Sequence, residues 1–275
     1  MTGKNVAAQP QQQRDPFLRQ VLFRLQRALP PTVFITVLIV AWEVVVRVRE
    51  ISPIVLPRPS AILARLASEP HYFLIENGLV TFNEAVAGFF LGAIVAMLLA
   101  LAMARSRLVE RCAFPIAVLI KATPIVVIAP LLIIWMGYGA TPKIVMAGLI
   151  CFFPILVNTI VGLRSVNPTS LEFFRSLAAT EFEIFTRLRV PHSLPYVLSA
   201  FKTAVSLAVI GAVVAEWAGA SRGLGRLVFL KAASLDQEAV FAGVFVLAGM
   251  GIFLTAIVSW LERRLLHWHE SSLSE

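Results

Sequence analysis

Six long apolar stretches dominate this sequence of 275 residues. A transmembrane helix needs about 20 consecutive, mostly apolar residues, and each stretch is close to that length or longer. They cover residues 31–48, 85–104, 112–135, 144–163, 197–215 and 239–261. Charged residues make up only 15% of the chain, whereas about 25% is usual in a water-soluble domain. The sequence therefore predicts an all-α protein that crosses a membrane six times.

The positive charges predict the orientation of these spans, because Lys and Arg are retained on the cytoplasmic side of a membrane. With a cytoplasmic N-terminus and six alternating spans, 16 of the 24 Lys and Arg residues lie inside. The acidic residues divide almost equally, so the net charge of +8 is almost wholly an inside excess. We therefore expect both termini in the cytoplasm, and we read the basic character as orientation, with no nucleic-acid partner.

The expected organisation is a six-span domain over residues 30–268 between two cytoplasmic tails. The N-terminal tail, residues 1–29, begins with a polar stretch that we expect to be disordered. Residues 17–29 form either a basic amphipathic helix on the membrane surface or a short structured tail. The C-terminal tail is 269–275. His267 and His269 lie at the start of this tail without the further ligands that a metal site needs, so no metal is expected.

The longest cytoplasmic loop, residues 164–195, contains two capping boxes, which mark helix starts. Thr169–Glu172 predicts a helix over Ser170–Ala179, and Thr180–Glu183 predicts one over Glu181–Val190 that ends at Pro191. Apolar residues recur through both at helical spacing, namely Leu171, Phe174, Ala178, Phe182, Phe185 and Leu188. An apolar stripe on a helix is stable in water only when other apolar groups pack against it. It packs on the helix ends of its own chain or it docks a cytoplasmic partner, and the pattern leaves both open.

The same loop resembles a motif of the permease subunits of ATP-binding-cassette (ABC) importers. That motif reads Glu-Ala-Ala, three residues, Gly, nine residues, Ile, one residue, Leu-Pro. Glu172 and Pro191 match it, and Leu188 and Val190 replace Ile and Leu conservatively.

Three positions depart from the motif, although the spacing is intact. Phe173 and Phe174 stand where the motif has two alanines, and Ala178 stands where it has glycine.

The resemblance extends over residues 30–268. The segments Leu56–Ser60, Thr123–Leu131, Ile134–Gly139 and Gly223–Gly225 resemble the nitrate/sulfonate/taurine-type branch of these permeases. That branch includes importers of thiamine-precursor pyrimidines and of riboflavin.

This resemblance implies a type I ABC importer permease in the inner membrane of a bacterium. It implies a homodimer that forms the translocation pathway, two ABC ATPase subunits, and an extracytoplasmic binding protein that delivers a small polar solute. The implied substrate classes are thiamine-precursor pyrimidines, riboflavin, sulfonates or taurine, and nitrate. The loop would then act as a coupling helix that contacts the ATPase. Its implied coupling residues are Glu172, Phe173, Phe174, Arg175, Leu177, Ala178, Ala179, Thr180, Glu181, Phe182, Leu188 and Pro191.

Prolines and polar groups inside spans indicate where a pathway through the membrane lies, because a proline opens the helix backbone. The candidate pathway residues are Pro124, Pro130, Trp135, Phe152, Phe153, Asn158 and Glu216. We expect Glu216 to face the pore mouth or to pair with Arg222 or Arg226. Glu43 is expected to pair with Arg47 one turn further along the first span.

No motif of the G-x-x-x-x-G-K-[ST] type is present, so we expect ATP to be bound by the partner subunit and this chain to need no cofactor. Gly219–Gly223 matches the G-x-S-x-G nucleophile elbow, but it follows a span where the elbow requires a strand. We therefore expect no catalytic residues and no enzyme activity of the chain itself. The alternative function is a stand-alone secondary transporter or channel, which would transport its solute without an ATPase.

Overall fold

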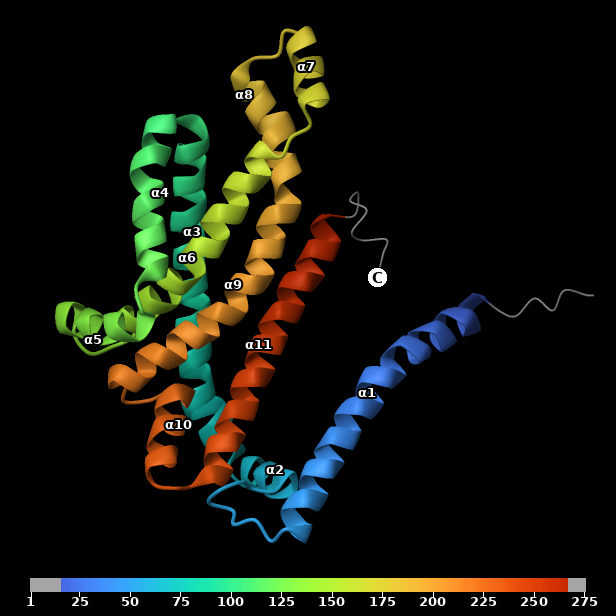
Figure 1. The fold of residues 1–275 in the computed structure, drawn as a ribbon, viewed down its shortest axis with the longest axis vertical. Helices are drawn as coiled ribbons and strands as arrows, with labels where there is room; N and C mark the ends of the chain where they lie inside the picture. Colours follow the sequence, from blue (N-terminus) through green and yellow to red (C-terminus); the bar gives the residue numbers. More distant parts are fainter. Residues whose placement is uncertain (1–15, 267–275) are drawn as a thin grey trace, which may run out of the picture. The chain divides into compact units, whose positions relative to one another are not determined.

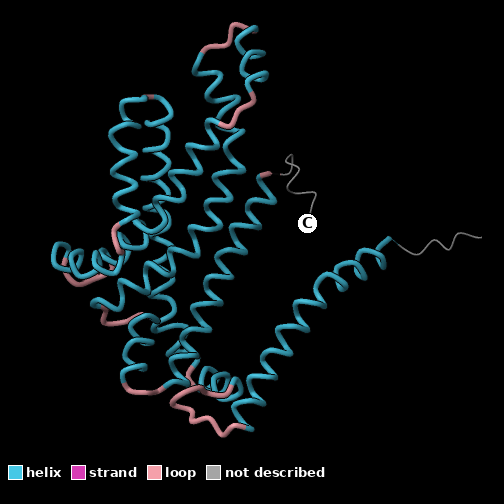
Figure 2. Tube along the Cα trace, in the orientation of Figure 1, coloured by secondary structure: helices cyan, strands magenta, loops and turns pink. Residues whose placement is uncertain are grey.

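The computed structural model describes residues 16–266, with side chains from Thr32 onward. The first 15 residues of the predicted N-terminal tail, the predicted C-terminal tail, and His267 and His269 lie outside the described residues. Throughout the described range, the regular structure is helical and no strand occurs (Figure 2). The chain divides into two compact units, Met1–Ala61 and Ile62–Glu275.

The first unit contains α1 (Pro16–Val48), one helix that includes both the first predicted span and the predicted surface helix at residues 17–29. The expected pair of Glu43 and Arg47 is confirmed, with 2.7 Å between Arg47 Nε and Glu43 Oε1. Glu43 also accepts hydrogen bonds from the amide of Ser60 at 3.0 Å and from its hydroxyl at 2.8 Å. Glu43 therefore ties the loop after α1 to the first turn of α2 (Pro59–Ser68).

The core of the second unit is formed by α3 (Leu79–Arg105), α6 (Thr141–Arg164) and α9 (Val190–Gly219), which pack against one another (Figure 1). The π-helix η1 (His71–Gly78) leads into α3. The helix α11 (Gln237–Leu265) packs against α9, and α10 (Leu224–Ala233) contacts both of these helices. Three of the predicted spans are thus the central helices.

Small residues allow α3 and α6 to approach closely. A Cβ added at Gly92 would lie 2.4 Å from the carbonyl oxygen of Gly148, so only glycine fits there. Ala85, Ala96 and Ala147 are fully buried in the same core. Close approach through small residues is the usual packing mode of membrane helices, because lipid offers no hydrophobic drive for their association.

The third predicted span, Cys112–Trp135, is wrong as a single helix. The segment forms α4 (Arg107–Ala122) and α5 (Ile125–Met136), which are bent by 102° relative to one another. Pro124 explains the break, because a proline disfavours helical backbone at the preceding residue, and Thr123 is extended.

Four helical runs among the described residues are long and apolar enough to cross a membrane, or five if the bent pair counts as one span. These four are His71–Arg105, Thr141–Arg164, Glu181–Gly219 and Gln237–Leu265. The count of six spans stays a prediction.

The loop after α6 contains α7 (Pro168–Ser176), α8 (Glu181–Ile184) and the π-helical turn η2 (Phe185–Arg189). The first predicted capping box is wrong: Asn167 caps α7 by accepting the Thr169 amide at 2.9 Å, and α7 ends at Ser176. The second box, from Thr180 to Glu183, is confirmed.

The predicted helix end at Pro191 is also wrong, since η2 leads directly into α9. In η2 the amide of Val190 bonds the carbonyl of Phe185, five residues back. The wider turn accommodates a proline, which cannot donate the ordinary helical hydrogen bond. Helical backbone therefore continues from Glu181 to Gly219.

Candidate functional site

The α7–α8 segment, residues 168–184, is held in one conformation by its caps. The Ala178 amide bonds the Arg175 carbonyl at 3.0 Å, and the Ala179 amide bonds the Phe174 carbonyl at 3.1 Å. This pair of bonds is a Schellman motif, in which the residue after the helix adopts left-handed backbone. Ala178 has φ of 55° and occupies that position. The structure thus requires left-handed backbone where the importer motif has glycine.

Three large apolar side chains of the α7–α8 segment are exposed: Phe173 at 61%, Leu177 at 64% and Phe182 at 75%. Of the predicted apolar stripe, four members are half-buried within the chain, namely Leu171, Phe174, Phe185 and Leu188. Ile184 is buried and anchors α8. The stripe is therefore split, because the chain covers part of it and leaves an apolar face open.

The polar members of the predicted coupling set surround this face. The Glu172 side chain makes no hydrogen bond or ion pair with the side chains and backbone described from Thr32 to Leu266, and the Glu181 carboxylate lies 3.9 Å from the Arg175 guanidinium group. Thr180 takes part in the capping box. Residues 172–182 of the set thus lie together on α7–α8, whereas Leu188 lies in η2 and Pro191 at the start of α9.

The candidate pathway residues are spread over neighbouring helices. Pro124 lies at the break before α5, Pro130 lies within α5, and Trp135 lies near its end and is exposed. Phe152, Phe153 and Asn158 lie on α6, where Phe152 is buried and Asn158 donates to the Pro154 carbonyl at 2.8 Å.

One residue of the pathway set contacts a charged side chain outside that set. Lys121 at the end of α4 stacks over the ring of Phe153, with its Nζ 4.5 Å from the ring centroid. A lysine over an aromatic ring is a stabilising cation–π contact. The contact joins the α4 side of the break to α6.

Glu216, near the end of α9, has no exposed surface. Its carboxylate accepts a hydrogen bond from the Thr81 hydroxyl at 2.6 Å and from the amides of Gly225 at 2.5 Å and Arg226 at 3.4 Å. The expected pairing with the side chain of Arg222 or Arg226 is wrong, because Arg226 contributes its backbone amide. A carboxylate at the first turn of a helix is favourable there, and α10 begins at Leu224.

The turn before α10 is bound to η1 and α3 by further hydrogen bonds. The Leu224 amide donates to the Thr81 hydroxyl at 2.8 Å, and the Gly223 amide donates to Asn77 Oδ1 at 3.0 Å. Gly223 has φ of 126°, and a Cβ there would lie 2.2 Å from Glu216 Oε1. This position therefore requires glycine for its backbone conformation and for space.

An ion pair lies beside Glu216. Lys143 Nζ of α6 is 2.8 Å from Glu84 Oε1 of α3, and both side chains are buried. The second oxygen of this carboxylate, Glu84 Oε2, is buried without a hydrogen-bond partner among the described residues. We call Asn77, Thr81, Glu84, Lys143 and Glu216 the polar cluster. It joins η1, α3, α6, α9 and α10.

Only Glu216 of the polar cluster was singled out from the sequence. The missed signal was the spacing of Asn77, Thr81 and Glu84, which places three polar side chains on one face of a helix. A polar face on an apolar helix must be satisfied inside the protein, since lipid offers no hydrogen bonds.

Residues 88–267 match the sequence model of the family described as "Binding-protein-dependent transport system inner membrane component". The chain belongs to this family. These proteins are the membrane-embedded permease subunits of ABC importers, so the chain is an integral protein of the bacterial inner membrane.

Two relatives match most of the permease. It is 36% identical over 247 residues to the formylaminopyrimidine transport permease protein ThiX of Halalkalibacterium halodurans, covering 90% of this chain and 98% of the relative. It is 31% identical over 245 residues to the riboflavin transport system permease protein RibX of Chloroflexus aurantiacus, covering 89% and 91%.

The permease also shares its fold with a solved transporter. A chain of the inward-facing MetNI methionine ABC transporter superposes with a TM-score of 0.63 at 15% sequence identity. The match covers 72% of this permease and 98% of that chain. The expected fold of a type I ABC importer permease is therefore confirmed.

Proposed function

We propose that this permease forms the translocation pathway of an ATP-driven importer as a homodimer and couples to two ATPase subunits through its α7–α8 segment. The proposal rests on the three exposed apolar side chains of that segment, Phe173, Leu177 and Phe182. Exposed apolar patches on a rigid support are typical of protein interfaces. If the α7–α8 segment is bound rigidly in a groove of the ATPase, movement of the ATPase moves the permease as a rigid body. Alternating access of a transporter requires such motion.

The orientation follows from the same proposal. If the ATPase contacts α7–α8, this segment lies in the cytoplasm, as do both termini in the alternating topology. The excess of Lys and Arg on that side supports this orientation. The ATPase subunits bind ATP, and this permease contributes no cofactor site.

An assembly experiment tests the docking surface. The Leu177→Asp variant is expected to lose co-purification with the ATPase subunit, because it places a charge in the exposed apolar face. The matched control is Leu108→Asp on α4, since Leu108 is a leucine exposed at 72% outside the α7–α8 segment. Normal binding-protein-stimulated ATP hydrolysis by the Leu177→Asp complex would refute the proposed docking surface.

The alternative of a stand-alone transporter or channel has its own signature. Such a protein moves solute across liposomes without an ATPase, whereas the proposed permease does not. Uptake by the isolated chain, at a rate unaffected by adding ATPase and ATP, would favour the alternative.

For the substrate, we propose a nitrogen heterocycle of the thiamine-precursor pyrimidine or riboflavin type. Two relatives above 30% identity carry formylaminopyrimidine and riboflavin in their names, and this supports that class over sulfonates, taurine or nitrate. Thermal unfolding of the cognate binding protein in the presence of each compound tests it. A shift with taurine or nitrate and none with the heterocycles would refute the assignment.

A further inference from the structure

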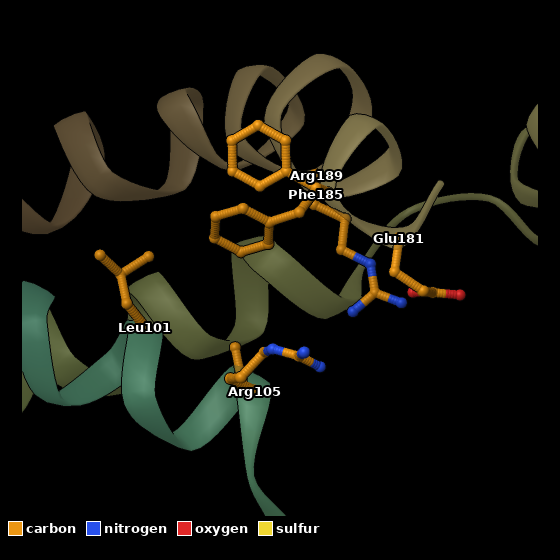
Figure 3. A pocket seen from close by; sticks show the side chains of 7 residues that line it. Leu101, Arg105, Glu181, Phe185 and Arg189 are labelled. Atoms are coloured by element: carbon orange, nitrogen blue, oxygen red, sulfur yellow. The ribbon is translucent and has the colours of Figure 1, made fainter. Parts of the chain in front are cut away.

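A pocket of about 510 Å³ lies between the C-terminal end of α3 and the α8–η2 region. Leu101 and Arg105 of α3 form one wall, and Phe182, Phe185 and Arg189 belong to the other. Figure 3 shows the Arg105 and Arg189 side chains coming from these two walls, with both guanidinium groups directed to the same side of the pocket. The pocket is therefore apolar at one side and basic at the other.

The two arginines are not neutralised by the permease itself. Neither the Arg105 nor the Arg189 side chain makes an ion pair or hydrogen bond with any residue in the range 32–266. Glu181 also lines the pocket, but its nearest cation is Arg175, at 3.9 Å. Two guanidinium groups face one carboxylate, so the pocket carries an excess positive charge. Paired guanidinium groups are well suited to a phosphate, which they bind through parallel hydrogen bonds.

The apolar wall continues along a membrane span. Ile94, Leu98 and Leu101 recur at helical spacing on α3, and all three side chains are exposed. They lie in the run His71–Arg105, which is apolar enough to cross a membrane, and Arg105 is its last residue. Lipid headgroups lie at the ends of such spans, and basic pockets between helices on the cytoplasmic side bind anionic headgroups. A ligand with an acyl chain and a phosphate matches both parts of the site.

We propose that this pocket binds the phosphate headgroup of an anionic phospholipid of the surrounding membrane, with its acyl chain along Ile94, Leu98 and Leu101. Arg105 and Arg189 bind the phosphate, and Phe185 packs against the part of the acyl chain nearest the headgroup. Because Phe182 belongs both to the pocket and to the exposed face of α7–α8, the bound lipid adjoins the proposed ATPase contact. A phosphate with an attached acyl chain is favoured over an acidic peptide, because the pocket is continuous with the exposed apolar stripe of α3.

Lipid binding to the purified permease tests the proposal without any ATPase. The double variant R105Q/R189Q is compared with R263Q/R264Q, which removes the same charge from the last turn of α11. Each protein is placed in phosphatidylcholine nanodiscs that contain increasing fractions of phosphatidylglycerol. The protein is then released from the nanodisc, and the lipid that stays bound to it is measured by native mass spectrometry. We expect R105Q/R189Q to bind phosphatidylglycerol roughly 30-fold more weakly than wild type, and R263Q/R264Q to bind it as wild type does.

Equal phosphatidylglycerol affinity of the two double variants would overturn the proposal. A second measurement compares the rise in the melting temperature of the wild-type permease with phosphatidylglycerol and with inorganic phosphate alone. Equal rises would also overturn the proposal, because the site would then be a small-anion site. If R105Q/R189Q loses ATPase binding in phosphatidylcholine nanodiscs while phosphatidylglycerol binding is unchanged, the pocket belongs to the ATPase contact. Unchanged thermal unfolding of R105Q/R189Q in phosphatidylcholine alone verifies that the variant is folded.

Discussion

Replacing Ala178 by glycine is expected to stabilise the α7–α8 segment. Left-handed backbone, here φ of 55°, costs a residue with a Cβ about 1–2 kcal/mol. Glycine avoids this cost but loses more conformational entropy on folding, roughly 0.5–1 kcal/mol relative to alanine. The net gain is about 0.5–1 kcal/mol, which corresponds to a two- to fivefold lower population of the open segment.

Hydrogen–deuterium exchange measures this effect where it arises. The amides of residues 178 and 179 make the two bonds of the Schellman motif, so their protection factors report its opening. In Ala178→Gly we expect both protection factors to rise two- to fivefold. The matched control is Ala179→Gly, one residue further on, where φ is not positive and glycine brings only its entropic cost. A fall in protection in Ala178→Gly, or equal effects of the two substitutions, would refute the reasoning.

Three other substitutions test contacts between helices of the second unit. Gly92→Leu is expected to prevent stable insertion or assembly of the bundle, because even a Cβ would lie 2.4 Å from the Gly148 carbonyl oxygen; wild-type yield and melting temperature would contradict this. Glu216→Ala is expected to lower stability by on the order of 3 kcal/mol. It leaves two α10 amides without their acceptor and leaves the Thr81 hydroxyl with only the Asn77 carbonyl, at 3.3 Å. Glu216→Gln should cost less, and equal thermal unfolding of the two variants would argue against the polar cluster. Glu110 of α4 forms a bidentate ion pair with Arg164 at the end of α6, at 2.6 and 2.7 Å. Glu110→Gln removes this ion pair and is expected to loosen the attachment of α4 to α6. Unchanged proteolysis of the α4–α5 region would count against a role of the ion pair in holding α4.

The helical content was predictable wherever apolar length decided the structure. The spans at α3, α6, α9 and α11 follow from runs of about 20 apolar residues, and their ends coincide with charges or caps. The capping box at Thr180 was predictable because both its members are local. The family resemblance was carried by residues in this same cytoplasmic loop.

The errors arose where a neighbouring segment decided the outcome. At Pro124 the helix breaks, and at Pro191 it continues, although the same local rule disfavours helix before each proline. The π-helical turn η2 makes the difference, and its hydrogen bonds depend on residues further back in the chain. The partners of Glu216 were missed because Thr81 lies 135 positions away in sequence.

The uninterrupted helix through Pro191 has a mechanical consequence. Its 39 residues from Glu181 to Gly219 give a contour of about 58 Å, with the proposed ATPase contact at one end and the polar cluster at the other. Between α8 and Glu216 the backbone is helical throughout, although Pro191 and Pro195 each lack the amide that makes the ordinary helical hydrogen bond. The orientation of α8 relative to α9 is therefore set by the number of residues in η2, and lengthening that turn by one residue would rotate α8 relative to Glu216 by about 100°.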